Sequence, residues 1–151
     1  MKLLFKKLKE NAVIPKYANP GDAGMDLFST EEYLLKPRER KLVSIGLAVE
    51  VPFGFELQIR PRSGLALKKG ISIVNTPGTI DSGYRGEIGI IMINHGEEEF
   101  KIIKGDKIAQ AILNKIETAD IEEVQELSET QRGDGGFGSS DLKNMEEPRF
   151  F

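Results

Sequence analysis

The segment from Asn75 to Ile88 (Asn-Thr-Pro-Gly-Thr-Ile-Asp-Ser-Gly-Tyr-Arg-Gly-Glu-Ile) contains residue types well suited to chemistry. It holds a Pro-Gly turn, the carboxylate of Asp81, the ring of Tyr84 and two further glycines. Glycine lets a backbone approach a ligand closely, so a hairpin of this composition could offer its N–H and C=O groups to a flat base. A plain β-hairpin with a solvated aspartate is the alternative, and this segment alone leaves it open.

The segment from Arg60 to Leu65 (Arg-Pro-Arg-Ser-Gly-Leu) predicts a turn that leads into a short helical stretch. Backbone N–H groups and the Ser63 hydroxyl could bind a phosphate there, and Arg62 would add a charged fork. Ser63 as a simple helix N-cap is equally open. Ser63 is not favoured as a nucleophile, because the nucleophile-elbow pattern is missing and the single histidine, His95, falls in a predicted turn.

The glycine-rich run from Gln131 to Ser140 predicts a mobile arm, because so many glycines cannot hold a regular element by themselves. One interpretation is a loop that closes over a ligand. Arg132 would then pair with phosphate, Phe137 would stack on a base, and Ser139 and Ser140 would donate hydrogen bonds. The alternative is a disordered glycine and serine tail, the usual state for this composition.

Composition narrows the choice of class and metal. The chain has 151 residues, no cysteine and one histidine, which disfavours zinc and suits magnesium brought in by substrate phosphates. Its net charge of −3 argues against stable nucleic-acid binding. Without a long apolar run there is no sign of a secretory signal or a membrane span, and we expect a cytoplasmic protein.

The elements that would position these residues are mostly strands, because apolar residues alternate more often than they follow a helical period. Strands are predicted at Phe55 to Ile59, Ile71 to Ile73, Arg40 to Val51, Phe100 to Ile103 and Ile108 to Leu113. Ile88 to Ile93 is nearly all apolar and predicts a strand covered on both faces, followed by a tight turn at Asn94-His95-Gly96. Leu65 to Lys69 predicts a short helix. Many short strands separated by turns indicate an all-β barrel or sandwich of jelly-roll type.

Five blocks of the sequence resemble, in order and spacing, the five motifs of the homotrimeric dUTPases (deoxyuridine triphosphatases). They are Asp22 to Leu27, Arg60 to Leu65, Asn75 to Ile88, Lys104 to Gln110, and Arg132 to Ser140. The resemblance runs from about residue 10 to residue 140. It implies a jelly-roll β-barrel over residues 1–130, a flexible closing arm over 131–140 and an extension over 141–151.

The resemblance also implies an activity and an assembly. The enzyme would hydrolyse dUTP to dUMP and pyrophosphate by Mg²⁺-assisted attack of water on the α-phosphate. This reaction limits uracil incorporation into DNA and supplies dUMP for dTMP synthesis. Three active sites would lie at the subunit interfaces of a homotrimer, each built from more than one chain.

Residue roles follow from the same resemblance. Asp81 would position and deprotonate the attacking water, and Tyr84 would pack against the deoxyribose and exclude a 2′-hydroxyl. Asp26 would lie near the metal and contact it through water. The uracil and sugar would be bound by Asn75, Gly78, Ile80, Tyr84, Gly89 and Phe137. The phosphates would be bound by Arg62, Ser63, Gly64, Gln110, Arg132, Gly138, Ser139 and Ser140.

Two departures from the family pattern stand out. Gly83 occupies a position where many relatives have a second acidic residue, which puts the support of the hairpin in doubt. Asp141 to Phe151 follows the last motif, where many relatives end.

Two rival functions stay open from the sequence. A dCTP deaminase shares the fold, although such enzymes usually lack the Arg132 to Ser140 arm and differ near Tyr84. A non-catalytic module that senses dUTP or holds a partner protein is the second rival. Asp81 and the complete arm argue against that module as the sole function.

Overall fold

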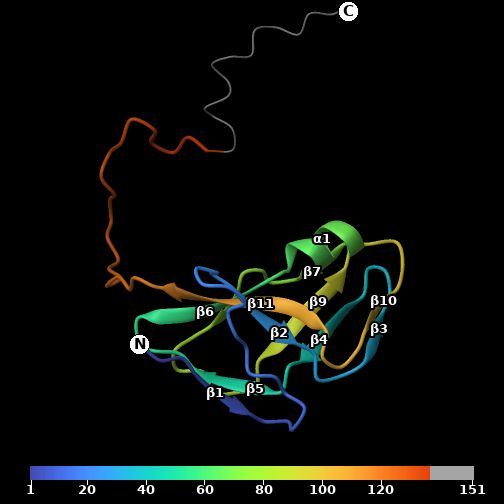
Figure 1. Ribbon diagram of the computed structural model, residues 1–151. Helices are drawn as coiled ribbons and strands as arrows, with labels where there is room; N and C mark the ends of the chain where they lie inside the picture. Colours follow the sequence, from blue (N-terminus) through green and yellow to red (C-terminus); the bar gives the residue numbers. More distant parts are fainter. Residues whose placement is uncertain (137–151) are drawn as a thin grey trace, which may run out of the picture. The chain divides into compact units, whose positions relative to one another are not determined.

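The computed structural model describes residues 1–136, so Phe137, Gly138, Ser139 and Ser140 lie outside the described residues. The chain divides into two compact units, Met1–Thr118 and Ala119–Phe151. Every helix and strand of the described part belongs to the first unit (Figure 1). The predicted segment boundaries at residues 130 and 140 stay predictions.

The first unit is built from antiparallel sheets, as its alternating apolar pattern predicts. Two larger sheets have the strand orders β2-β11-β6-β8 and β4-β9-β7, and β1-β5 and β10-β3 form two-stranded ribbons. The strands are β1 (Leu4–Lys7), β2 (Met25–Phe28), β3 (Tyr33–Leu35), β4 (Arg40–Ser44), β5 (Leu47–Glu50), β6 (Phe55–Arg60), β7 (Ile71–Ile73), β8 (Gly78–Ile80), β9 (Gly89–Asn94), β10 (Phe100–Ile102) and β11 (Lys107–Lys115). The all-β, jelly-roll-type fold with one short helix is therefore confirmed for residues 1–136.

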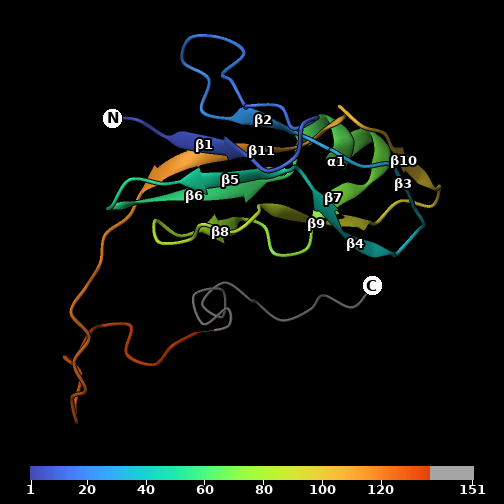
Figure 2. The same cartoon turned by 90° about the horizontal axis from the view of Figure 1, so that it is seen from below.

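The core lies between the inward faces of these sheets. Along β6, Leu57 and Ile59 are buried while their neighbours are partly exposed, which is the period-two pattern of a half-buried strand. Strand β6 runs beside β11, with Leu57 opposite Leu113 (Figure 2). The largest fully buried side chains are Leu27, Leu35, Val43, Ile45, Leu47, Leu57, Ile71, Ile88, Ile90, Met92, Ile102 and Ile108.

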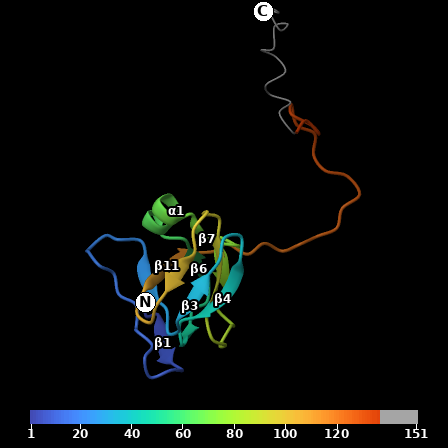
Figure 3. The same ribbon diagram turned by 90° about the vertical axis from the view of Figure 1, so that its right-hand side faces the viewer.

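One helix, α1 (Ser63–Lys69), lies between β6 and β7 in the sequence and packs close to β7 (Figure 3). The prediction of a helix at Leu65 to Lys69 is confirmed, with the helix beginning two residues earlier. It ends at Gly70, whose φ of 66° is the left-handed conformation that glycine adopts at helix ends. No helix within residues 1–136 is long and apolar enough to cross a membrane.

Two strand predictions need correction. The region from Arg40 to Val51 is two strands, because Gly46 turns the chain with a φ of 65°. Strand β4 pairs with β9 while β5 pairs with β1. The prediction that Ile88 to Ile93 is covered on both faces is wrong, since buried and half-buried residues alternate along β9. Half of its apolar side chains have no complete cover within one chain.

The segment from Asn75 to Ile88 is not a plain hairpin. Its first strand, β8, pairs with β6, whereas β9 pairs with β4 and β7. Strands β8 and β9 therefore belong to different sheets, and the loop from Asp81 to Ile88 connects them. The predicted turn after β9 is confirmed: the Gly96 N–H donates to Asn94 Oδ1 at 2.8 Å.

Candidate active site

A polar pocket of about 360 Å³ forms where β2, β11 and the start of α1 meet. Eight of its ten lining residues come from three separate motif blocks of the sequence. They are Ala18, Asp22, Ala23, Gly24, Asp26, Arg62, Ser63, Gly64, Gln110 and Ile112. The pocket thus brings together Asp26 and all four of the predicted phosphate-binding residues that lie in the first unit.

Strand pairing and side-chain contacts build this pocket. Asp26 on β2 lies opposite Gln110 on β11, which also pairs with Arg60 on β6. The Gln110 amide donates to the main-chain oxygen of Pro61 at 2.9 Å and so holds the turn before α1 against the sheet. A Cβ at Gly24 would overlap Oε1 of Gln110, so a larger residue here would force the end of that side chain to shift.

The start of α1 presents free donors to the pocket. Arg62 is the N-cap, with extended backbone and no side-chain capping bond, and Ser63 is the first helical residue. The interpretation of Ser63 as the N-cap is therefore wrong. Ser63 and Gly64 are exposed, and the first N–H groups of a helix have no partner within it. These groups and the hydroxyl can bind phosphate oxygens.

Asp26 is paired with two cations at the edge of the pocket. Its Oδ1 lies 3.0 Å from Arg62 Nε, and its Oδ2 lies 2.8 Å from Lys107 Nζ. Arg62 also donates to the main-chain oxygen of Lys107 at 3.2 Å. Asp26 thereby fixes the guanidinium of Arg62, whose remaining N–H groups can bind an anion. Lys107 was not among the predicted site residues, although it lies inside the Lys104 to Gln110 block.

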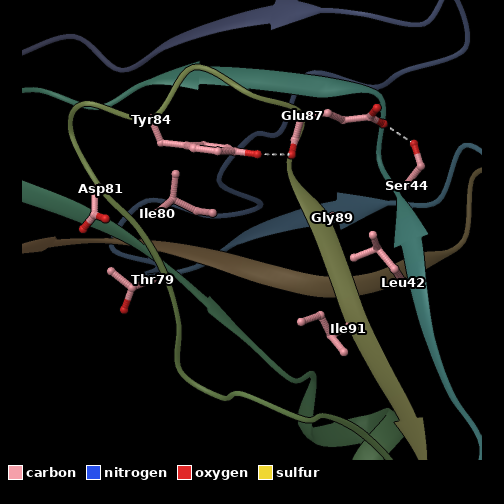
Figure 4. Close-up of a pocket in the computed structure, with 9 residues that line it drawn as sticks. All are labelled: Leu42, Ser44, Thr79, Ile80, Asp81, Tyr84, Glu87, Gly89 and Ile91. Carbon is pink, nitrogen blue, oxygen red and sulfur yellow. Dashed lines mark hydrogen bonds between the residues drawn. The ribbon is translucent and has the colours of Figure 1, made fainter.

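A second, more apolar pocket of about 390 Å³ lies beside the loop that follows β8 (Figure 4). It shares no lining residue with the polar pocket. Its lining residues come from β4, β8, the loop and β9: Leu42, Ser44, Thr79, Ile80, Asp81, Tyr84, Glu87, Gly89 and Ile91. Four predicted residues meet here, namely Ile80, Asp81, Tyr84 and Gly89. An apolar pocket with a few polar groups suits a planar ring.

The loop orders Asp81 and Tyr84 in different ways. The Tyr84 hydroxyl donates to the main-chain oxygen of Glu87 at 2.9 Å (Figure 4). The main-chain N–H of Tyr84 donates to the main-chain oxygen of Asp81 at 3.1 Å. The Asp81 carboxylate is exposed and accepts no hydrogen bond from any residue of the described chain. It is therefore free to bind a water molecule.

Glu87 lines the pocket but was not among the predicted site residues. Its carboxylate accepts a hydrogen bond from the Ser44 hydroxyl (Figure 4), and this bond is the main cause that holds its pKa below the ordinary value. Lys9, 3.7 Å away, and the Gly46 N–H lower the pKa further, while burial opposes them. Glu87 lies inside the quoted Asn75 to Ile88 segment, but its partner at the end of β4 is distant in sequence.

Of the other predicted residues in the first unit, Asn75 and Gly78 line neither pocket. Asn75 is exposed in the turn before β8, and its amide lies 3.2 Å from where a Gly78 Cβ would be. Gly78 is buried against β6. Arg132 belongs to the second unit, where its Nε donates to the main-chain oxygen of Gly135 at 2.8 Å. Phe137, Gly138, Ser139 and Ser140 fall outside the described residues.

The donor set fits a magnesium ion that arrives with a polyphosphate. Within residues 1–136, no three acidic or histidine side chains gather into a ready-made cage. The polar pocket does contain the carboxylates of Asp22 and Asp26. Mg²⁺ commonly keeps several waters and takes one or two carboxylates together with substrate phosphates. Because both Asp26 oxygens are paired with cations, this residue suits contact through water.

The fold and the two pockets define a class: a small β-barrel domain with one polar pocket and one more apolar pocket. The family model "dUTPase" matches residues 10–141, and the chain belongs to this family. A curated relative, the deoxyuridine 5′-triphosphate nucleotidohydrolase of Clostridium novyi (strain NT), is 61% identical over 140 residues, which cover 93% of this chain and 99% of the relative.

Two solved structures share the fold. The dUTPase of Staphylococcus bacteriophage 80alpha, in complex with dUpNHpp, has a TM-score of 0.85 and 31% identity, covering 91% of this chain and 97% of that one. A mutant dUTPase from phage phi11 of S. aureus has a TM-score of 0.80 and 28% identity, covering 85% of this chain and 100% of that one. The latter is described as revealing the coordination of a structural Mg(II) ion.

Proposed function

We propose that the chain is a dUTP diphosphatase that hydrolyses dUTP to dUMP and pyrophosphate. One observation carries the proposal: Asp26, Arg62, Ser63, Gly64 and Gln110, from three separate motif blocks, line one polar pocket. A triphosphate needs several donors and a cation to neutralise its charge, and this pocket offers an arginine, a hydroxyl, an amide and free helix N–H groups.

In the proposed reaction, the Asp81 carboxylate accepts a proton from a water molecule while the water oxygen attacks the α-phosphorus. A new P–O bond forms, the bond between the α-phosphorus and the bridging oxygen breaks, and pyrophosphate leaves. Base assistance of this kind contributes roughly 10²–10⁴-fold. Arg62 and the donors at the start of α1 stabilise the charge that develops on the phosphates. Mg²⁺, when bound, supplies further neutralisation of the phosphate oxygens.

Selectivity in the proposal comes from the apolar pocket and the segment beside it. Main-chain groups around Asn75, Gly78 and Gly89 bind uracil, and a snug fit rejects the thymine methyl by steric clash. Cytosine is rejected because its reversed donors and acceptors leave buried groups unpaired. Tyr84, 44% exposed in the free chain, offers its ring to the deoxyribose. Phe137 and the other arm residues would complete the site from the last motif.

We further propose a homotrimer with active sites shared between subunits. Support comes from the apolar lining of the second pocket, where Leu42 is 61% exposed opposite the half-buried Ile91 on β9. Leaving such a pair in water is unfavourable, so cover by another copy stabilises the fold. The two pockets share no residue within one chain. A site that combines the polar pocket of one copy with the loop of another is consistent with this separation.

In the cell, removal of dUTP would limit uracil incorporation into DNA, and the dUMP formed would supply dTMP synthesis. A cytoplasmic location and the absence of stable nucleic-acid binding stay predictions from composition. The test of the proposal is a nucleotide panel of dUTP, UTP, dTTP and dCTP, assayed with and without magnesium. We expect pyrophosphate release from dUTP and from none of the other three nucleotides. Ammonia from dCTP would support the deaminase instead, and binding of dUTP without turnover would support the non-catalytic module.

A further inference from the structure

Glu87 fastens the loop from Asp81 to Ile88 to a neighbouring corner of the barrel. Its carboxylate accepts hydrogen bonds from the Ser44 hydroxyl and, at 3.2 Å, from the Gly46 N–H. Lys9 Nζ lies 3.7 Å from the same oxygen. Ser44 ends β4 and Gly46 precedes β5, so these two hydrogen bonds reach the corner between β4 and β5, whereas Lys9 comes from the segment after β1. The side chain therefore connects the loop to the end of β4, which pairs with β9 at Gly89, and to the turn that follows β4.

The corner itself is rigid. The hydroxyls of Ser44 and Thr30 also form a hydrogen bond of 3.0 Å, and Thr30 is buried. A Cβ at Gly46 would lie 2.9 Å from Lys9 Cβ and 3.0 Å from Thr30 Cγ2, which shows how closely this corner is packed. An acceptor bound to such a corner has little freedom to move.

The main chain of Glu87 holds Tyr84. Its oxygen accepts the Tyr84 hydroxyl at 2.9 Å, and a Cβ at Gly86 would overlap that hydroxyl, so the ring packs directly against the glycine. On the following residue, the Ile88 N–H donates to the main-chain oxygen of Leu47 at 2.8 Å. The oxygen that orients Tyr84 is therefore fixed from one side by Ile88 and from the other by the Glu87 carboxylate.

We propose that Glu87 is a positioning residue that sets the place of the Tyr84 ring and thereby the discrimination between deoxyribose and ribose. The inference rests on the proposed function, in which Tyr84 packs against the sugar. A ring held in one place leaves no room for a 2′-hydroxyl, whereas a ring that shifts by about an ångström admits it, and misplacement on that scale is enough to change rates strongly. Glu87 acts through Tyr84 and does not take part in the chemical step.

The test compares kcat and KM for dUTP and UTP in the wild type, Glu87→Ala and Glu87→Gln. In Glu87→Ala we expect the ratio of kcat/KM for dUTP over UTP to fall about tenfold, the size that loss of a hydrogen bond to a charged group allows. The change should appear mainly in KM, because Asp81 is untouched. Glu87→Gln should stay close to the wild type, since its amide oxygen accepts the same bonds from Ser44 and Gly46.

A double-mutant cycle with Tyr84→Phe separates positioning from general loosening. If Glu87 acts through the tyrosine hydroxyl, the effects of the two changes should not add. The double variant should then keep a dUTP-over-UTP ratio no lower than that of the single variant with the lower ratio. Glu39→Ala is the matched control, because Glu39 also accepts a tyrosine hydroxyl, that of Tyr33, outside both pockets. Its discrimination ratio should equal that of the wild type. If Glu87→Ala does not fold, Ser44→Ala removes the same anchor and should lower the ratio in the same direction.

Unchanged discrimination in folded Glu87→Ala or Ser44→Ala, or additive effects in the cycle, would overturn the inference while dUTP hydrolysis by the wild type still stood. A wild type that does not cleave dUTP at all would overturn the proposed function and this inference together.

Discussion

Arg62 Nε lies 3.0 Å from Oδ1 of Asp26, so the cation at the start of α1 is paired with a carboxylate on β2 before any ligand arrives. The other oxygen of Asp26 binds Lys107 at 2.8 Å. The carboxylate thus orients two cations, and with 23% of its side chain exposed it can still meet water in the pocket. Asp26 therefore connects the arginine proposed to bind phosphate with the place proposed for a hydrated metal.

Replacement of Asp26 by Asn should disturb both functions. The neutral amide cannot hold Arg62 and Lys107 as tightly, and it is a weaker acceptor for water bound to Mg²⁺. We expect kcat/KM for dUTP to fall roughly tenfold to hundredfold, as for residues that support a metal from the outer shell. The Mg²⁺ concentration at half-maximal activity should rise. Steady-state assays over a Mg²⁺ series measure both, with Glu117→Gln as an exposed control. An unchanged Mg²⁺ dependence would argue against the role.

Replacement of Asp81 by Asn should abolish most turnover and preserve binding. The carboxylate accepts no hydrogen bond within the described residues, so the change removes the base and leaves the loop intact. We expect kcat to fall by about 10²–10⁴-fold. Titration calorimetry with dUpNHpp should give a dissociation constant close to that of the wild type. Near-normal turnover in this variant would refute the role of Asp81.

Mixing two inactive variants tests whether the sites are shared. Asp81→Asn removes the proposed base on the loop beside the apolar pocket, and Arg62→Ala removes a cation from the polar pocket. If one site takes the loop from one subunit and the polar pocket from another, trimers assembled at random from both variants contain about a quarter of intact sites. Activity should therefore return to about that fraction of the wild type after co-refolding. Light scattering checks the trimer, and an inactive mixture would indicate sites within single chains.

Truncation after Thr130 should separate folding from catalysis. All helices and strands of the described residues lie within Met1–Thr118, so the shortened chain keeps every element that builds the two pockets. We expect an unchanged circular dichroism spectrum and melting temperature, but slow dUTP hydrolysis, because Arg132 and the rest of the last motif are removed. A second variant cut after Ser140 keeps the motif and should be active. Full activity of the shorter variant would show that the arm is dispensable.

Acid should destabilise the fold through glutamates whose pKa values are lowered. Side-chain hydrogen bonds are the main cause for each: Ser44 for Glu87, Gln58 for Glu56, and Tyr33 for Glu39. A lowered pKa stabilises the folded state fully above the ordinary value of 4.5, and this contribution is lost as the pH falls through the folded-state pKa.

Urea unfolding between pH 7 and pH 3 measures this loss. The free energy of unfolding of the wild type should decline below about pH 4.5. In Glu56→Gln one of these groups no longer titrates, while its amide oxygen can still accept from Asn114, which lies 3.0 Å from the carboxylate in the wild type. Its curve should decline less steeply. Parallel curves for the two proteins would show that Glu56 does not contribute.

The sequence by itself determined the kind of element and the chemistry available. Period-two alternation at Phe55 to Ile59 and at Ile71 to Ile73 predicted strands that the structure confirms, because alternation directly reflects which side of a pleat is buried. The five motif blocks predicted the family, since the residue types that bind phosphate and a base are few and their order is specific. Glycine positions and apolar runs did not predict which strands pair with one another.

Only the tertiary structure decided which residues meet. That β8 and β9 belong to different sheets, that Gly46 breaks a strand region in two, and that Glu87 is anchored by Ser44 all depend on contacts between residues distant in the sequence. The same is true of the pairing of Asp26 with Lys107. Local patterns state whether a side chain is buried. The partner it meets depends on the register and order of the strands, which the whole chain fixes by packing one shared core.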